Sequence, residues 1–358
     1  MRYPLLVCAV VSQGLLLVSP ESASAVGFRH DVAPFSSIPG EAAYRDHAGN
    51  DAFAPVAMVS VIYEYNVPGF GTFESVRATG SGTLIDGRHL LTAAHVLDFA
   101  SSSAFKRFEV EWKSPEGFTG PGFPQNTSAV ALDSFIHPRY DGSPQGGGDI
   151  GLIRFDQEIS GVTPATLHRG TVAQGSLAHF AGYGNRGDGV NGMVENSSGE
   201  LRAGTNTIDI VGTPQSYNVP GLGTRNNPLK WMADDMAYSD FDDPALLGQP
   251  ASASTFDNNR TGWHEPTDLE ALLLPGDSGG GMFLVDPDTG EFTLAGVNVW
   301  RFNFGGRASD IYTTVNGATL VDPYLDWIDQ ITIPAPWSAP ALALSFTLCC
   351  NRRRRPVN

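Results

Sequence analysis

Short apolar segments alternate with turns rich in glycine, proline and aspartate along most of the chain. Residues 56–63 (Val-Ala-Met-Val-Ser-Val-Ile-Tyr) form a largely β-branched run between two prolines, which is typical of a buried strand. Residues 108–112 alternate apolar and acidic side chains, which indicates a strand with one solvated face. The pair Asp86-Gly87 between two apolar segments predicts a hairpin turn.

The remaining apolar segments predict further strands. They cover residues 75–79, 82–85, 90–92, 129–136, 150–155, 179–184, 205–211, 229–236, 281–285, 293–300 and 310–315. Residues 320–330 carry apolar side chains at helical spacing and predict a C-terminal helix. We expect residues 185–199 to form a surface loop and residues 234–266 to form an acidic, irregular insertion. Short strands between glycine turns indicate β-barrels or a β-sandwich.

Composition favours a β-rich protein over a helical bundle. The 358 residues include 41 glycines and 25 prolines, and only 17% of the residues are charged. The formal net charge is −16 at pH 7, so we expect no nucleic-acid partner, because phosphate backbones select basic surfaces. A chain of this length can hold one large or two small domains.

Both ends of the chain have the pattern of targeting segments. Residues 1–25 combine a basic start, an apolar run and a final Ala-Ser-Ala, which predicts a secretory signal peptide. Residues 333–358 combine prolines, a short apolar stretch and four arginines, and they resemble the PEP-CTERM sorting tails of Gram-negative bacteria. They depart from that pattern at Ala335, where the name-giving glutamate would stand, and a simple C-terminal anchor is the alternative. We expect a secreted or cell-surface protein with transient membrane association through this tail.

The three cysteines, Cys8, Cys349 and Cys350, all lie in these terminal segments. The part between them therefore contains no disulfide, and its stability depends on the buried core. We divide it into an N-terminal segment or short propeptide over residues 26–54 and a main domain over residues 55–332, expected to be monomeric.

We expect no cofactor and no metal, since the sequence has no phosphate-binding loop and no paired Cys/His motif. A calcium site formed by the acidic residues between positions 234 and 243 is the alternative.

Three short motifs carry candidate chemistry. Residues 92–95 (Thr-Ala-Ala-His), 149–153 (Asp-Ile-Gly-Leu-Ile) and 276–280 (Gly-Asp-Ser-Gly-Gly) supply a histidine, an aspartate and a serine beside small neighbours. A serine hydroxyl is a weak nucleophile at neutral pH. It needs a base within hydrogen-bond reach and a carboxylate that orients this base. An α/β-hydrolase would need its histidine after the serine, but the last histidine of the chain is His264.

In this order the three motifs resemble the active-site blocks of trypsin-like serine proteases, over roughly residues 56–330. The resemblance implies an all-β protein of two six-stranded antiparallel β-barrels (the chymotrypsin-like fold), with a C-terminal helix and an active site between the barrels. It implies Ser278 as the nucleophile and His95 as the general base and then acid. Asp149 would orient His95, and the backbone N–H groups of Gly276 and Ser278 would form the oxyanion hole.

From the residues alone, other carboxylates compete with Asp149 as the partner of His95. The competing residues are Asp98, Asp133, Asp141 and Asp156. We prefer Asp149 because a glycine run precedes it and an apolar strand follows it, so its carboxylate would lie at the edge of the core.

The resemblance also implies substrate-binding residues. It places Leu272 at the floor of the specificity pocket, where trypsin-like enzymes carry an aspartate, and it places Asp310 at a pocket wall. Either Asp310 receives an Arg or Lys side chain of the substrate, or it caps a strand and faces solvent. Val299 and Trp300 lie in a segment that resembles the one pairing with the substrate backbone. Arg301 follows where glycine is usual, and it would narrow the pocket or repel basic substrates.

Activation of zymogens in this family depends on a new N-terminus that pairs with the aspartate before the catalytic serine, here Asp277. The expected mature start, Val26-Gly27, resembles such termini, so signal peptidase itself would generate the activating α-amine. Cleavage of a propeptide before Pro55 is the alternative.

Together these features predict a secreted serine endopeptidase that hydrolyses protein or peptide substrates through an acyl-enzyme intermediate. Two alternatives remain open. One is a catalytically inactive protease-fold protein that binds a surface or matrix, and the other is an esterase that uses the same triad.

Overall fold

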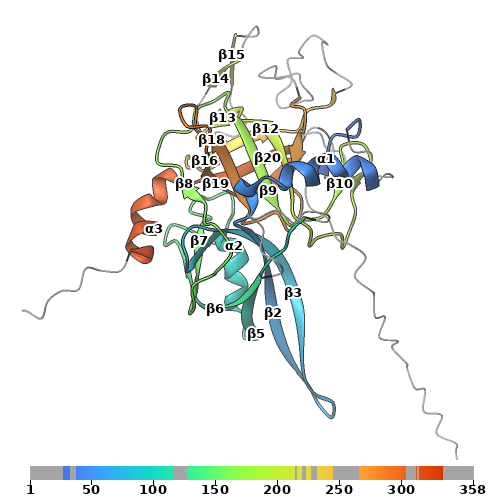
Figure 1. Ribbon diagram of the computed structural model, residues 1–358, viewed down its shortest axis with the longest axis vertical. Coiled ribbons are helices and arrows are strands. Elements are labelled where there is room, and N and C mark those ends of the chain that lie inside the picture. Colours follow the sequence, from blue (N-terminus) through green and yellow to red (C-terminus); the bar gives the residue numbers. More distant parts are fainter. Residues whose placement is uncertain are drawn as a thin grey trace, which may run out of the picture.

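The computed structural model describes residues 27–32, 38–115, 127–213, 216–219, 223–226, 232–244, 266–303, 312 and 314–333. Strands predominate, as the sequence predicts, and they form one closed barrel and one curled sheet with helices at the edges (Figure 1). The predicted signal peptide, Val26, Asp310 and the tail beyond Ile333 lie outside the described residues.

The closed barrel comes from the first half of the chain and contains six antiparallel strands in the order β2-β3-β4-β7-β6-β5. Their bounds are Val56–Val67 (β2), Gly71–Leu84 (β3), His89–Thr92 (β4), Phe105–Trp112 (β5), Thr127–Ile136 (β6) and Gly151–Phe155 (β7). Two of the predicted strands, over residues 75–79 and 82–85, belong to the single strand β3. The predicted turn is present, and Asp86 Oδ1 accepts the backbone N–H groups of Arg88 and His89.

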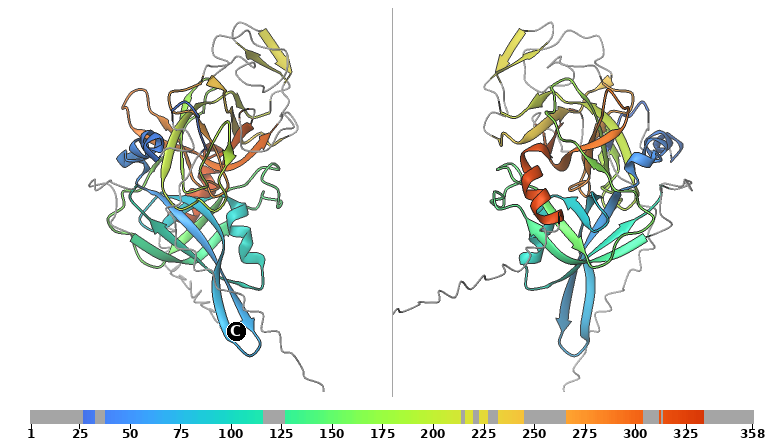
Figure 2. Two further views of the ribbon diagram at one scale, coloured as in Figure 1. Left: turned by 90° about the vertical axis from the view of Figure 1, so that its right-hand side faces the viewer. Right: turned by 60° about the vertical axis from the view of Figure 1, so that its left-hand side comes forward.

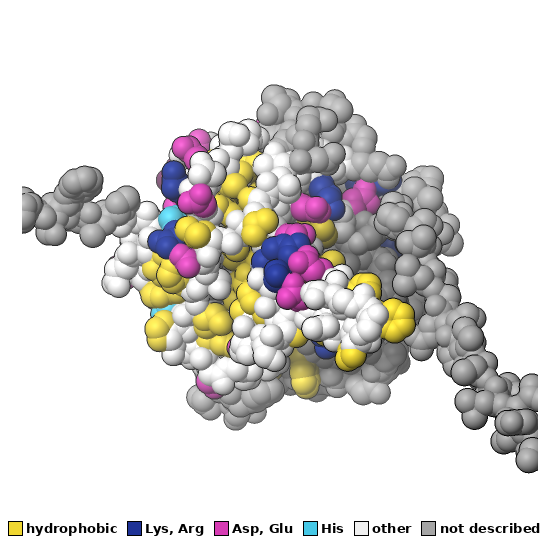
Figure 3. All heavy atoms as spheres, turned by 90° about the horizontal axis from the view of Figure 1, so that it is seen from below, with side chains coloured by type: hydrophobic (Ala, Val, Ile, Leu, Met, Phe, Trp, Pro, Cys, Tyr) yellow, Lys and Arg dark blue, Asp and Glu magenta, His cyan; other side chains and the backbone are white. Residues whose placement is uncertain are grey.

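The hairpin of β2 and β3 extends well below the barrel (Figures 1 and 2). Its outer part exposes Tyr65, Val67, Phe70 and Phe73, and Phe70 at the tip is 80% exposed. Seen from below, exposed apolar side chains lie beside clusters of opposite charges (Figure 3).

The curled sheet comes from the second half of the chain and has the strand order β12-β9-β18-β19-β20-β16-β13, with β8 paired to β19. The bounds are Thr166–Leu167 (β8), Leu177–Gly182 (β9), Arg202–Thr207 (β12), Ile210–Val211 (β13), Met236–Asp240 (β16), Gly281–Val285 (β18), Phe292–Asn303 (β19) and Thr314–Leu320 (β20). The hairpin β14 (Ser216–Val219) and β15 (Gly223–Asn226) stands apart from it.

The two ends of the curled sheet, β12 and β13, are separated only by Ile208 and Asp209. Ile208 donates its N–H to Ser176 beside β9, whereas Asp209 donates its N–H to Tyr238 in β16. The chain thus changes partner strand between two consecutive residues, and the sheet bends into a half-barrel. Of the two predicted barrels, the structure shows one closed barrel and this half-barrel, an architecture compatible with a chymotrypsin-like fold.

A small third sheet holds the N-terminal residues. β1 (Gly27–Phe28) lies between β10 (Gly187–Asp188) and β17 (Ala271–Leu272), and β11 (Gly192–Met193) completes the sheet. The prediction of a surface loop over residues 185–199 is therefore wrong, since this segment contributes two short strands. Its glycine-rich composition gives no sign that the N-terminus covers it.

Two more predictions in this half differ from the structure. Residues 232–235 form no strand, and β16 begins at Met236, inside the segment that was expected to be irregular. The strand predicted over residues 310–315 overlaps β20, which begins at Thr314; Tyr312 lies in a turn, and residues 310, 311 and 313 lie outside the described residues.

Helices lie at the edges. α1 (Ile38–Ala48), which the sequence did not predict, packs on β12 and buries Tyr44. α2 (Ala94–Leu97) follows β4 directly, and single turns occupy Asp51–Phe53 and Asp98–Ser101. The predicted C-terminal helix is confirmed as a short turn, η4 (Asp322–Tyr324), followed by α3 (Leu325–Thr332). Within the ranges given above, no helix has the length and apolar content that a membrane span requires.

Candidate active site

His95 and Asp149 meet at one edge of the closed barrel. Thr92 at the end of β4 pairs with Gly151 at the start of β7, so the residues just beyond them are neighbours. Asp149 Oδ2 lies 2.7 Å from His95 Nδ1, and Asp149 Oδ1 accepts the backbone N–H of His95 at 2.8 Å. Asp149 is completely buried. A buried carboxylate at Nδ1 keeps the proton there and leaves Nε2 able to act as a base.

A glycine pair and a distant aspartate hold Asp149 in place. Gly147 and Gly148 have φ angles of +90° and +69°, and a Cβ on Gly148 would lie 2.8 Å from the backbone of Arg139. Gly148 donates its N–H to Asp235 Oδ2 at 2.9 Å, and this buried carboxylate also accepts a hydrogen bond from the Tyr324 hydroxyl in η4. The segment before β16 and the C-terminal segment thus position the carboxylate that contacts His95.

Ser278 lies in the turn between β17 and β18, and Ser81 of β3 fastens this turn to the closed barrel. Ser81 donates its N–H to the Ser278 carbonyl and its hydroxyl to the Gly276 carbonyl, both at 2.7 Å. The same hydroxyl accepts the N–H of Tyr183 at 2.9 Å. The backbone of the Ser278 turn approaches β3 closely here, and only glycine fits, because a Cβ on Gly279 would lie 2.0 Å from the Ser81 carbonyl oxygen.

Sequence reasoning missed Ser81 although a signal was present. The small residues Gly80, Ser81 and Gly82 stand where the two strands predicted over residues 75–79 and 82–85 meet. In the structure these small residues lie inside β3, where glycine permits another backbone to approach closely. Asp235 was also missed as a positioning residue, since nothing distinguishes it from the acidic residues around it.

Gly80 lies between the segments that carry His95 and Ser278. A Cβ on Gly80 would lie 3.0 Å from both methyl carbons of Val96 and 3.2 Å from the Ser278 carbonyl oxygen. Both candidate residues are partly exposed at this junction. Among the described residues, no hydrogen bond joins the Ser278 hydroxyl to the His95 ring. Such bonds commonly tighten only when substrate binds.

Gly276 and Ser278 carry the two backbone N–H groups that the resemblance assigns to the oxyanion hole. Gly276 has a φ angle of +101°, and a Cβ there would lie 2.7 Å from the Cα of Gly184. Within the described part of the chain, neither Gly276 nor Ser278 donates its N–H to another backbone group.

Asp277, the expected partner of an activating N-terminus, is completely buried. Its two carboxylate oxygens accept the N–H groups of Gly184 at 2.9 Å and of Leu274 at 2.8 Å. The N-terminal strand is nearby, since a Cβ on Gly27 would lie 3.1 Å from Leu272 Cβ and 3.4 Å from Leu274 Cδ1. β1 and Asp277 thus flank the same short segment.

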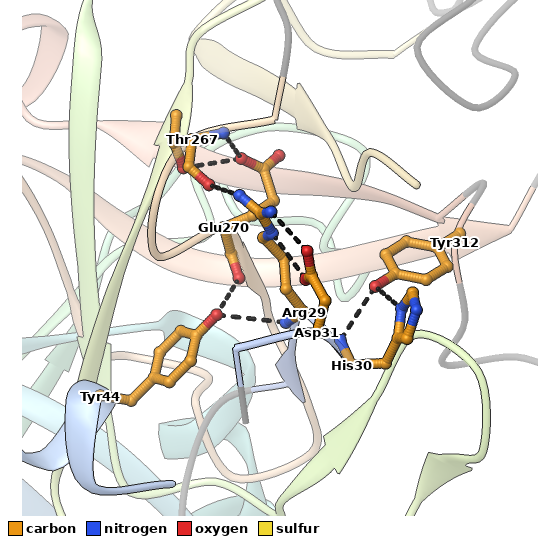
Figure 4. Close-up of polar contacts among 7 residues, drawn as sticks. All are labelled: Arg29, His30, Asp31, Tyr44, Thr267, Glu270 and Tyr312. Carbon is orange, nitrogen blue, oxygen red and sulfur yellow. Dashed lines mark hydrogen bonds and ion pairs between the residues drawn. The ribbon is translucent and has the colours of Figure 1, made fainter. Parts of the chain in front are cut away.

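A polar network holds the N-terminal segment in place (Figure 4). Arg29 forms an ion pair with Asp31 at 2.7 Å and donates to the Thr267 carbonyl at 2.6 Å. The hydroxyl of Tyr44 accepts the Arg29 backbone N–H and donates to the Glu270 carbonyl. Residues 267–270, which lead toward Ser278, are thereby tied to the start of the chain.

A pocket of about 290 Å³ opens beside Ser278. The described residues that line it are Leu273, Leu274, Pro275, Ser278, Val299, Trp300 and Arg301. Of the predicted substrate-binding residues, Val299 and Trp300 thus lie together with Ser278. Leu272 is buried in a cluster with Phe241 and Tyr312 and does not line this pocket.

Where the structure describes side chains, no group of three or more His, Cys, Asp or Glu residues is arranged to bind a metal ion. In the acidic segment considered for calcium, Asp234 is paired with Arg139 at 2.7 Å.

Comparison of the sequence with protein-family models finds no match, and comparison with curated proteins finds no significant match. The geometry of the site therefore carries the argument about function.

Proposed function

We propose that this protein is a secreted serine endopeptidase of the chymotrypsin-like fold. The observation that carries the proposal is the contact between the buried Asp149 and His95, together with the fastening of the Ser278 turn to Ser81, which also accepts a hydrogen bond from Thr92, three residues before His95. These three groups have the residue types and the chain order of the catalytic triad in the resembled family.

In the proposed reaction, Ser278 Oγ attacks the carbonyl carbon of the scissile bond while His95 Nε2 takes the hydroxyl proton. The N–H groups of Gly276 and Ser278 stabilise the oxyanion, and Asp149 stabilises the imidazolium. Imidazolium then protonates the leaving amine, which leaves an acyl-enzyme on Ser278. Water, activated by His95, releases the acid product and restores the serine.

We propose further that β12 and β13 act as one bent strand that closes a second six-stranded barrel. The change of partner between Ile208 and Asp209 supports this, since Ile208 bonds to Ser176 beside β9 near one end of the sheet and Asp209 bonds to β16 near the other. Substrate would then bind in the cleft between the two barrels.

The N-terminal segment belongs to the mature enzyme in this proposal, and the α-amine of Val26 pairs with Asp277 after signal-peptide cleavage. The insertion of β1 between β10 and β17 supports it, because Gly27 already lies against Leu272 and Leu274. Deletion of Val26 should abolish activity, and a fully active deletion variant would contradict this activation route.

Export, a sorting tail and a monomeric state are proposed from the terminal sequence patterns alone. Mass spectrometry of the protein recovered from culture medium and from membranes would locate both cleavage sites. An intact residue 358 in the secreted form would contradict removal of the tail.

The central test is labelling with a serine-directed acylating probe, followed by peptide cleavage by the exported full chain. Wild type should be labelled at Ser278 and should cleave, whereas Ser278→Ala and His95→Ala should lose activity by roughly 10⁴-fold or more. A folded wild type that is not labelled by the probe and cleaves no peptide would indicate the inactive binding protein. Labelling with hydrolysis of small esters but of no peptide would indicate the esterase.

A further inference from the structure

The hairpin of β2 and β3 carries an uncharged tip away from the closed barrel. β2 pairs with β5 only as far as Tyr63, and beyond it β2 and β3 continue as a two-stranded ribbon to Val67 and Gly71. This ribbon projects below the barrel in each ribbon view (Figures 1 and 2). Residues 65–73 contain no charged side chain, and all of them are exposed. The structure thus presents an uncharged segment to the surroundings of the molecule.

The turn at the end of the ribbon holds Phe70 in an exposed position. The Val67 carbonyl accepts the Phe70 N–H at 2.9 Å, and Gly69 and Gly71 have φ angles of +85° and +95°, which favour glycine. Pro68 has a fixed φ angle and stiffens the turn. Phe70 is 80% exposed. Because the turn is already ordered, its ring can bind a partner with little loss of conformational entropy.

One face of the ribbon adds further apolar area. Tyr65 and Phe73 lie directly opposite each other in the register, and Val67 follows two residues after Tyr65 on the same face. All three side chains are exposed. Asn66 and Thr72 pair on the other face, and both are polar but uncharged. Tyrosine is enriched where proteins contact the headgroup layer of a membrane, and phenylalanine supplies apolar area there.

Paired charges mark the end of this tip. Glu64 and Glu74 lie opposite each other in the register, next to Tyr65 and Phe73. Lys106 Nζ lies 2.6 Å from Glu64 Oε2, and Arg107 Nη1 lies 2.7 Å from Glu74 Oε2. On this face of the molecule, clusters of opposite charges lie beside exposed apolar side chains (Figure 3). We call these four charged residues the collar. They limit how far the tip can enter a bilayer, because a charged side chain is costly there.

We propose that the tip of this hairpin, residues 65–73, inserts into the headgroup layer of a lipid bilayer while the collar stays in water. A stable protein interface uses about 20–30 residues on each side. The tip has only nine residues, whereas a lipid surface needs no partner of complementary shape. The inference is independent of the proposed endopeptidase function.

The backbone of the ribbon limits the depth of insertion. Among the described strands, β5 pairs with β2 only up to Tyr63, and β4 pairs with β3 only at Thr83 and Leu84. The outer N–H and C=O groups of the tip therefore have no strand beside them and need other polar partners. Lipid headgroups and interfacial water supply such partners, but the hydrocarbon core does not. We therefore expect the tip to stay in the interfacial layer.

The test uses the full chain and vesicles of phosphatidylcholine, whose zwitterionic headgroups do not repel a chain with a net charge of −16. Phe70→Trp adds one indole at the tip. Its fluorescence, measured as the difference from wild type, should be quenched when the lipid acyl chains are brominated. The matched control is Val190→Trp, because Val190 is 60% exposed and follows β10, which lies away from the hairpin tip in Figure 1. The fluorescence added there should not be quenched.

A second measurement compares binding strengths. Phe70→Ser combined with Phe73→Ser should weaken partitioning into these vesicles by about tenfold or more, since two apolar side chains lose their burial. The loss should persist at high salt, because no ion pair is removed. Val190→Ser should partition as wild type does. Any binding through the terminal segments is common to all these proteins and cancels in the comparison.

Three results would overturn the proposed insertion. They are a wild type that does not bind the vesicles, an added indole at position 70 that is not quenched, and a double variant that partitions like wild type. Sedimentation of the lipid-free chain tests a second copy as the alternative occupant. A dimer in wild type that is absent in the double variant would assign the tip to self-association, and it would also overturn the insertion.

Discussion

The closed barrel and the curled sheet bury different kinds of side chains. The polar side chains buried within the barrel strands are four hydroxyls and one imidazole, those of Ser60, Ser81, Thr83, Thr92 and His89. The curled sheet and the segments around it bury several carboxylates and an arginine as well, whereas the buried carboxylate of the barrel side, Asp149, lies outside the strands, just before β7. The buried ionisable groups around the curled sheet include His179, Arg202, Asp209, Asp235, Asp240, Asp242, Glu270 and Asp277. An apolar interior is specified by local pattern, whereas buried charges require partners from other segments.

Removal of a buried charge partner should have the largest effect on the free energy of unfolding. Arg202 is fully buried and contacts Glu41 of α1 at 3.1 Å and Glu200 at 2.8 Å. Arg202→Ala should lower the free energy of unfolding by about 3–5 kcal/mol, because it leaves carboxylates buried beside a cavity. Urea unfolding measures the loss.

The matched control is the double replacement Arg202→Met with Glu41→Leu. Apolar residues of similar volume should recover much of the stability, since the charges of Arg202 and Glu41 are both removed and Glu200 keeps Arg45 as a partner at 3.5 Å. A double variant as unstable as Arg202→Ala would mean that packing, rather than charge, accounts for the loss.

A cavity created in the apolar core of the closed barrel should lower the free energy of unfolding somewhat less than the loss of Arg202. Leu152 is completely buried in β7, and Leu152→Ala should lower the free energy of unfolding by about 2–4 kcal/mol. Because the barrel core is apolar, Leu152→Met should cost less than about 1.5 kcal/mol. A polar isostere tolerated equally well at this position would contradict an apolar barrel interior.

The same difference explains what the sequence could predict. The β-branched run of residues 56–63 identified β2 correctly, because a continuous apolar pattern already indicates burial. The motif at residues 276–280 was found from residue type and order, without any knowledge of the fold.

Other features were hidden from the sequence because their cause lies in distant segments. β1 is held by Gly187 and Leu272, and α1 is docked by the buried Arg202. A two-residue strand has no periodicity of its own, and a buried arginine looks like a surface residue in the sequence. In the sequence, Arg301 stood out only because glycine is usual at this position in the resembled family. Its role as a pocket wall required the position of β19.

The histidine pair between α1 and β9 should make the stability of this half depend on pH. His47 Nε2 lies 3.0 Å from His179 Nδ1, and burial together with His47 lowers the pKa of His179 to about 4. The unfolded chain, with an ordinary pKa near 6.5, binds more protons between these values. Stability is therefore full above pH 6.5 and falls on acidification, by about 2 kcal/mol between pH 7 and pH 5.

The measurement is urea unfolding of wild type and of His179→Phe across this pH range. Glu270 changes the stability in the opposite direction, so that it adds stability on acidification. Burial raises its pKa to about 8, and the folded state therefore binds a proton that the unfolded state has lost at pH 7. Wild type and His179→Phe share the Glu270 contribution, so it cancels when their unfolding free energies are subtracted. A difference in unfolding free energy that stays constant from pH 7 to pH 5 would exclude His179 as the acid-sensitive group.

The smallest effect on stability is expected at Ser81, where the two halves are joined. Ser81→Ala removes the hydroxyl that donates to the Gly276 carbonyl and accepts the Tyr183 N–H, so two buried backbone groups lose a partner. Stability should fall by about 1–2 kcal/mol.

The effect of Ser81→Ala on catalysis should be larger than this loss of stability suggests, because among the described residues the turn that presents Ser278 is then hydrogen-bonded to the closed barrel only through the Ser81 backbone N–H. Acylation of Ser278 should slow by roughly tenfold or more, since small displacements of a nucleophile are costly. Ser60→Ala is the matched control, as Ser60 is buried in β2 of the same barrel. Equal acylation rates for both variants would mean that the turn keeps its geometry without the Ser81 hydroxyl, and the junction would then depend on the backbone contacts between the two halves.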